Sequence, residues 1–182
     1  IGFVRAEVNA RETERALARA EEEAEKAQGI SAFFARSLTS VAPYDMGIDV
    51  LVVDVLEQAA ADVDERLGDR PAAQAIVRRT IGDSYRTLGH FAEAEEHLSA
   101  VMEYVDGELE PDDPFAIEAG DSWAAFLQAT QRLTEAEAFC RELLPLAIER
   151  LGREHRETIR IRNTLGRALL DRGQLAEAEE LL

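Results

Sequence analysis

Three histidines and one cysteine are the side chains of this 182-residue sequence best suited to chemistry. Histidine and cysteine bind zinc when three or four of them lie at short spacing, and a cysteine beside a histidine can act as a nucleophile. His90 and His97 are seven residues apart, but no third or fourth ligand lies near them, and His155 is remote. Cys140 shares its place in an internal repeat with leucines, which predicts a buried apolar role. We therefore predict neither a metal site nor a cysteine nucleophile.

Carboxylates are the other abundant reactive group. The sequence has 37 Asp and Glu against 20 Lys and Arg, a formal net charge of −17. No two of these carboxylates have a spacing that distinguishes them as a catalytic acid and base. We therefore predict no enzyme activity and no cofactor. Eight acids and no base lie within residues 102–121, and they form either a solvated connector or a docking patch for a basic partner, which salt would weaken. These acids are Glu103, Asp106, Glu108, Glu110, Asp112, Asp113, Glu118 and Asp121.

The net negative charge also limits the partners. Nucleic acid or an anionic membrane surface would be repelled, so neither is predicted. No apolar run approaches the roughly 18 residues of a membrane-spanning helix, so no insertion into a membrane is predicted. We expect a soluble fragment, with the cytoplasm as its default compartment.

Residue types recur along the chain with a period of 42. Residues 91–95, 133–137 and 175–179 share one phrase, in which an alanine stands between two glutamates. The same offset relates Ile81, Trp123 and Leu165; Gly82, Ala124 and Gly166; Tyr85, Leu127 and Leu169; and Ala94, Ala136 and Ala178. A fixed period of this length is typical of stacked helix pairs. These positions are predicted to pack in the core, which assigns Trp123 to packing rather than to ligand stacking.

The repeats predict an all-α solenoid. Short turns around Gly89 and Gly173 predict antiparallel hairpins, and Asp113 followed by Pro114 predicts a helix N-terminus. Helices are expected over residues 49–67, 72–88, 91–106, 115–130, 133–151, 156–172 and from 175 onward, which gives pairs over residues 72–106, 115–151 and 156–182.

A polar segment precedes the repeats. Residues 1 to about 37 predict a long helix interrupted at Gly29. Its last part carries a stronger apolar face, with Phe33, Phe34 and Leu38, that is expected to dock on the repeats. We therefore divide the chain into residues 1–42, a helical linker and docking segment, and residues 43–182, the repeat array.

The repeat positions resemble the tetratricopeptide repeat, whose signature is a large apolar residue, Gly or Ala, and an aromatic, then Gly, an aromatic and Ala. The first copy matches best, through Ile81, Gly82, Tyr85, Gly89, Phe91 and Ala94. The 42-residue period and the connector over residues 151–158 resemble the kinesin-light-chain type, although Arg156 replaces a proline. The resemblance implies a right-handed superhelix of helix pairs that binds a peptide or a partner domain.

The resemblance also implies that the first helix of each pair lines a concave groove. The candidate groove residues are Arg79, Asp83, Arg86, Asp121, Ser122, Gln128, Arg160, Asn163 and Arg167. Asn163 matches an asparagine that this subtype uses to hold a peptide backbone, but Asp121 and Arg79 occupy the equivalent places, so no asparagine ladder is present. Arginines at both ends with acids between them suit an extended peptide of mixed charge.

A second resemblance covers the helix rich in Arg, Ala and Glu at the N-terminus, the segment from Ile30 to Val41 that contains Phe-Phe-Ala-Arg-Ser-Leu, and the helix from Val52 to Leu67. This part of the chain is similar to a segment of certain bacterial membrane-anchored serine/threonine protein kinases, in which the segment follows a transmembrane helix and leads into tetratricopeptide repeats. Residues 1–5 would then be the end of such a span, and the chain a piece of a longer protein. The sequence itself contains no Gly-rich loop, His-Arg-Asp or Asp-Phe-Gly motif of a kinase.

Two functions remain open from the sequence. The first is a protein-interaction scaffold within a larger protein, for example a bacterial serine/threonine kinase of this kind. The alternative is self-association, through the N-terminal helix or an open C-terminal end, which would bring parent proteins together.

Overall fold

The structure, a computed structural model, describes residues 52–181, so the predicted segment over residues 1–42 lies outside the described part. That part contains seven helices and no strand, which confirms the all-α prediction. The helices are α2 (Val52–Leu67), α3 (Pro71–Leu88), α4 (Phe91–Glu108), α5 (Pro114–Ala129), α6 (Leu133–Leu151), α7 (Arg156–Asp171) and α8 (Leu175–Leu181). Each predicted helix start or end over residues 52–181 falls within three residues of the observed one.

The chain divides into two compact units between Gln74 and Ala75, inside α3. In the first unit, α2 closes where the Gly68 N–H donates to the Asp64 carbonyl at 3.0 Å. The Gln74 amide then donates to the Asp64 carboxylate at 2.7 Å, which ties the first turn of α3 to the last turns of α2.

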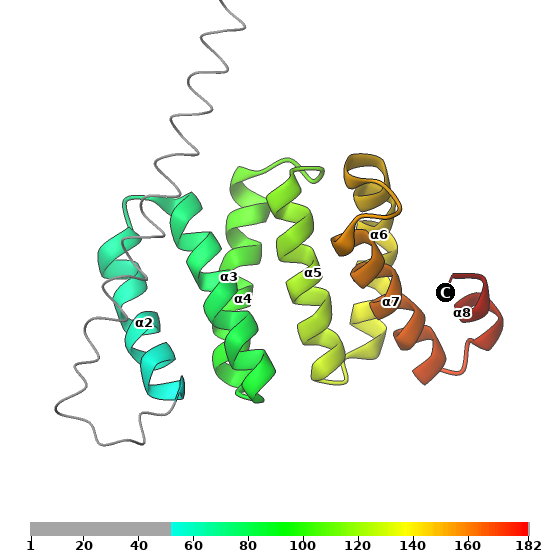
Figure 1. Cartoon of the computed structure of the whole chain (residues 1–182), viewed down its shortest axis with the longest axis horizontal. Helices are drawn as coiled ribbons and strands as arrows, with labels where there is room; N and C mark the ends of the chain where they lie inside the picture. The colour runs from blue at the N-terminus through cyan, green and yellow to red at the C-terminus, as the bar shows by residue number, and fades with distance from the viewer. Residues whose placement is uncertain (1–51, 182) are drawn as a thin grey trace, which may run out of the picture. The chain divides into compact units, whose positions relative to one another are not determined.

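In the second unit, helices α3 to α8 follow one another in chain order (Figure 1). Packing contacts join α4 to α5, α5 to α6, α6 to α7 and α7 to α8. Helices α5 and α7 also contact each other directly, although α6 lies between them in the sequence. First helices of successive pairs therefore lie side by side, as expected for a helical solenoid.

The three hairpin turns share one conformation. Gly89, Gln131 and Gly173 stand 42 residues apart and have positive φ values of 81°, 61° and 77°. The next residue in each turn donates a backbone hydrogen bond to a carbonyl five residues earlier: His90 to Tyr85 (2.9 Å), Arg132 to Leu127 (2.8 Å) and Gln174 to Leu169 (2.8 Å). This left-handed closure caps the first helix and reverses the chain, which makes each pair antiparallel.

Helix α5 begins as its sequence predicts. Asp113 is the N-cap, its carboxylate accepts a hydrogen bond from the Phe115 N–H at 2.8 Å, and Pro114 occupies the first turn. The cap satisfies a backbone donor that the helix leaves without a partner, and the proline ring is already shaped for this position.

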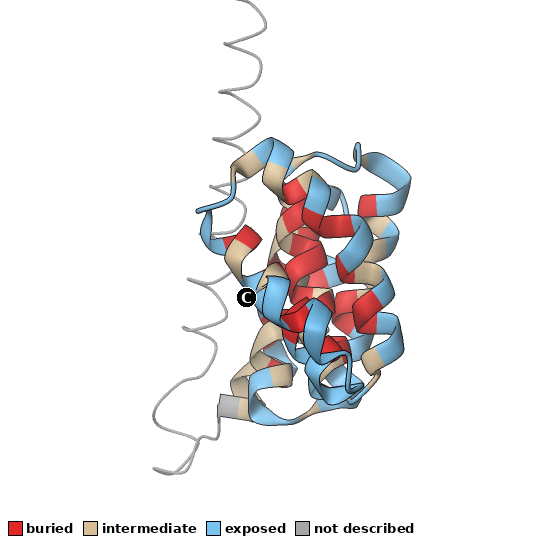
Figure 2. Cartoon of the chain, turned by 90° about the vertical axis from the view of Figure 1, so that its right-hand side faces the viewer, coloured by how far each residue is buried: buried red, intermediate tan, exposed pale blue. Residues whose placement is uncertain are grey.

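The repeat positions form the core. Ala94, Ala136 and Ala178 are all completely buried, as predicted. A methyl group on Gly82 would lie 2.7 Å from the Leu98 side chain, so α3 and α4 approach too closely for a larger residue there. Figure 2, which looks from the α8 end, shows buried residues facing inward on the helices and exposed residues facing outward.

Candidate functional site

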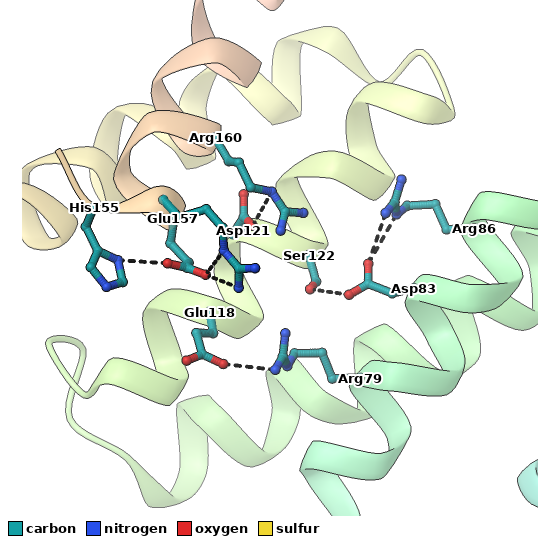
Figure 3. A network of polar contacts seen from close by, with 10 residues as sticks. Arg79, Asp83, Arg86, Glu118, Asp121, Ser122, His155, Glu157 and Arg160 are labelled. Carbon is teal, nitrogen blue, oxygen red and sulfur yellow. Dashed lines mark hydrogen bonds and ion pairs between the residues drawn. The ribbon is translucent and has the colours of Figure 1, made fainter. Parts of the chain in front are cut away.

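Polar side chains from three first helices, α3, α5 and α7, lie close together on one side of the second unit (Figure 3). The repeat period sets this arrangement, because residues 42 apart occupy the same place on successive helices. We call this set the polar face. Figure 3 shows seven of its members together, namely Arg79, Asp83, Arg86, Glu118, Asp121, Ser122 and Arg160. Three further members, Gln128, Asn163 and Arg167, are assigned to it because they stand 42 or 84 residues after Arg86, Asp121 and Asp83.

Helices α3 and α5 are joined by two polar contacts on this face. Arg79 Nη2 lies 2.9 Å from Glu118 Oε2, and the Ser122 hydroxyl donates to Asp83 Oδ2 at 2.7 Å. The other oxygen of Asp83 receives Arg86 at 3.2 Å. Both arginines of α3 that the sequence places in the groove are therefore paired with carboxylates of the same face.

Asp121 lies at the centre of the polar face and is only 2% exposed. Its Oδ2 atom pairs with Arg160 Nε of α7 at 3.0 Å. The pKa of Asp121 is raised to about 6, mainly by burial and also by the nearby charges of Asp83 and Glu157, while the opposing charge of Arg160 limits the rise. The group is therefore ionised at neutral pH but close to taking up a proton.

Three buried polar atoms on this face have no hydrogen-bond partner within the described structure. They are Asp121 Oδ1, Gln128 Nε2 and Arg79 Nε. A buried polar group without a partner is costly, and a ligand or a bound water that completes it recovers that cost. One of these atoms, Asp121 Oδ1, is a hydrogen-bond acceptor, and the other two are donors.

At the start of α7, Glu157 is a functional candidate that the sequence reasoning missed. It is 5% exposed and pairs with Arg156 at 2.7 Å and with His155 Nδ1 at 2.7 Å. Burial alone would raise the pKa of Glu157, but the Arg156 hydrogen bonds and the His155 charge leave that pKa below its ordinary value. Glu157 directly follows the exposed residues His155 and Arg156, so the local sequence gave no sign that its side chain would be buried.

The remaining predicted residues, Asn163 and Arg167, are exposed on α7. The structure thus places Arg79, Asp83 and Asp121 in three neighbouring sets of polar contacts, in which their partners are Glu118, then Arg86 with Ser122, and then Arg160. Three of the four arginines of the polar face pair with acids of the same face: Arg79 with Glu118, Arg86 with Asp83, and Arg160 with Asp121.

The chemistry considered from histidine and cysteine has no geometric support in residues 52–181. No group of three or more His, Cys, Asp or Glu there could hold a metal ion. Cys140 is completely buried, and burial, aided by the charge of Asp121, raises the pKa of its thiol to about 12. His97 is also buried, with its ring stacked on Tyr85 at 5.9 Å between centroids.

Trp123 lies at the edge of the core rather than inside it. Its ring stacks on Phe126 at 5.1 Å, and the Arg132 guanidinium lies 5.7 Å from the ring centroid. The indole of Trp123 therefore packs against Phe126, and the guanidinium of Arg132, from the hairpin turn that follows α5, makes a cation–π contact with it.

These features define a helical-repeat solenoid built from TPR-like helix pairs. Residues 117–182 match the family model of the tetratricopeptide repeat. No curated protein sequence matches the chain significantly. None of the described helices is long and apolar enough to span a membrane.

Two solved structures give the same fold. The chain is similar to the nearly identical TPR-like repeats of a Podosopora anserina protein assigned as a kinesin light chain, with 25% sequence identity and a TM-score of 0.57. That match covers 71% of this chain and 61% of the other, so the chain spans less than two thirds of its length. A single-substitution variant of those repeats matches at 17% identity and a TM-score of 0.52, over 91% of this chain and 87% of that chain.

Proposed function

We propose that the chain is a protein-interaction module that binds an extended peptide segment of a partner across the polar face. The observation that carries this proposal is the set of buried atoms without partners, Asp121 Oδ1 together with Gln128 Nε2 and Arg79 Nε. An extended peptide backbone offers N–H donors to the first and carbonyl acceptors to the other two. Helical repeats present extended surfaces of this kind to partners, which supports a binding role rather than a catalytic one.

A peptide array of mixed-charge sequences tests this proposal. The double variant Arg86→Glu with Arg167→Glu reverses charge at two ends of the polar face, and we expect it to lose peptides that the unmodified protein retains. Arg150→Glu with Arg153→Glu changes the net charge equally, at exposed positions outside the face, and should retain them. Equal retention by both double variants, with unchanged melting curves, would contradict binding on this face.

A second candidate function is self-association, which exposed apolar residues favour. Leu170 and Leu175 are 41% and 59% exposed beside the α7–α8 turn. Light scattering on the chain, on a version lacking residues 1–28 and on Leu170→Gln with Leu175→Gln would assign any oligomer to one of the two ends. A monomer at all concentrations would exclude this function.

We also propose that these repeats serve as a regulatory region of a larger protein such as a bacterial serine/threonine kinase. The support is the sequence pattern over residues 30–67. The sequence immediately before Ile1 tests it, because an apolar span of about 20 residues preceded by a kinase domain is expected. The absence of both features would contradict it.

A further inference from the structure

A pocket of about 270 Å³ lies on α4, α5 and α6, together with the connector between α4 and α5. Three of its lining residues, Val105, Ala116 and Leu143, are almost completely buried. Other lining residues, among them Met102 and Phe139, are partly exposed, so the pocket opens to the surface. Two of its three helices, α4 and α6, are second helices, whereas the polar face uses the first helices α3, α5 and α7. The pocket is therefore a separate surface feature from that face.

The pocket has the dimensions of a side-chain site. Small-molecule sites typically measure about 300–1,000 Å³, and this pocket is slightly smaller. The close approach of α5 and α6 helps to form it, because a methyl group on Gly120 would lie 2.7 Å from Leu143 Cδ2. Leu143 is thus held against α5 at the base of an apolar hollow.

The charge around the opening is acidic. Asp106 and Glu142 line the pocket and are exposed, and no basic residue is among the lining residues. The neighbouring Glu103, Glu110 and Asp112 are exposed as well, within the stretch of residues 102–121 that carries no base. An apolar hollow surrounded by carboxylates favours an apolar side chain whose neighbours are basic.

We propose that this pocket is a second docking site, which takes a leucine-sized or aromatic side chain from a partner segment with flanking arginines or lysines. The apolar side chain fills the hollow over Val105, Ala116 and Leu143. The flanking cations pair with Asp106 and Glu142. The acidic stretch is then part of a binding surface rather than only a solvated connector.

Synthetic fluorescein-labelled peptides test this site through fluorescence anisotropy. The first probe carries one leucine between arginines, the second replaces the leucine with alanine, and the third replaces the arginines with glutamates. We expect only the first to bind well, and binding should weaken as sodium chloride is raised. Equal binding of the first two probes would overturn the proposal, because it would show attraction to the net negative chain alone.

Protein variants locate the binding. Asp106→Lys with Glu142→Lys should weaken the leucine–arginine probe by about tenfold or more, which is about 1.4 kcal/mol or more. Glu96→Lys with Glu149→Lys makes the same charge change at exposed positions of α4 and α6 outside the pocket lining, and should weaken it much less. Equal weakening by the two double variants would overturn the proposal.

Two further measurements separate this site from other occupants. Arg86→Glu with Arg167→Glu, on the polar face, should leave the affinity for the leucine–arginine probe within about twofold, so that failure of one proposal is distinguishable from failure of the other. A peptide copying residues 28–40 serves as a competitor. If it displaces the probe at concentrations at which an unlabelled copy of the alanine probe has no effect, the pocket would bind a segment of this chain, which would overturn the proposal of a separate partner.

Discussion

Asp121 is a buried carboxylate whose ionised form is only partly compensated by its surroundings. One carboxylate oxygen pairs with Arg160, the other has no hydrogen-bond partner in the described structure, and burial works against the ionised form. The carboxylate nevertheless stays ionised at neutral pH, because Arg160 offsets part of the desolvation. Such an arrangement costs stability in the folded protein.

The raised pKa gives a pH dependence with a definite sign. Between the ordinary value of 3.8 and the folded value of about 6, the folded protein holds a proton at Asp121 more often than the unfolded chain does. Stability from this group is therefore present below about pH 4 and lost as pH rises to about 6, by roughly 3 kcal/mol at most.

The variant Asp121→Asn isolates that contribution. We expect its free energy of unfolding, relative to the unmodified protein, to increase by roughly 2–3 kcal/mol between pH 4 and pH 7. Urea titrations across this range measure the difference, and the many other carboxylates cancel because both proteins contain them. A difference that does not change with pH would show that Asp121 titrates normally.

Asp121 also shows which features of a single residue could be predicted from the sequence. Asp121 stands 42 residues after Arg79 and 42 before Asn163, and the repeat pattern therefore predicted that these three residues occupy equivalent positions on successive helices. The burial of Asp121 and its pairing with Arg160 depend on how two helices separated by α6 come together, which no local pattern encodes. Glu157 was missed for the same reason.

At the scale of elements, the three hairpin turns recur with the 42-residue period. Two of the three use glycine in the left-handed conformation, while the middle turn places Gln131 there at φ 61°. A side chain disfavours this conformation by roughly 1–2 kcal/mol, whereas glycine adopts it freely. The middle hairpin is thus strained where its neighbours are not.

Replacing Gln131 with glycine should therefore stabilise the protein. Glycine also makes the unfolded chain more flexible, so we expect a net gain of about 0.5–1 kcal/mol, which is about 1–4 °C in melting temperature. Gly89→Ala is the matched change in the opposite direction, since a Cβ there meets no atom within 4 Å and only the backbone conformation is tested. If Gly89→Ala raised the melting temperature, or Gln131→Gly lowered it, the turn would not be strained.

Helix positions were predictable from the sequence because capping and turn signals are local. Asp113 with Pro114 marked the start of α5, and the 42-residue offset transferred the boundaries of one pair to the next. The pocket was not predictable, because its lining comes from three helices and depends on how closely α5 and α6 approach at Gly120. In the sequence, only Gly120 hinted at this close approach, because arginines stand 42 residues before and after it.

At the scale of the whole molecule, the packing of the second unit is sequential. Helix α5 packs against α4, α6 and α7, whereas α8 packs against α7. In such an array, stability is close to a sum of terms from each helix pair and its neighbours. Local opening should therefore cost least at α8 and most in the α5–α7 region.

Hydrogen exchange followed by mass spectrometry measures that gradient. Amides of α8 should exchange first and those of α5 to α7 last, since α8 has one buried residue, Ala178. Equal protection of α8 and α5 would show that the unit opens only as a whole. The comparison needs no substitution, and so the protein serves as its own control.

The buried thiol has a practical consequence. Cys140 is the only cysteine of the chain, it is completely buried, and its pKa of about 12 keeps it protonated at neutral pH. Thiol reagents attack the ionised form, so a maleimide dye should bypass this position while the protein is folded. A cysteine introduced at exposed Asn163 would then carry the sole label, and one fluorophore on an otherwise native chain could report what arrives at the polar face.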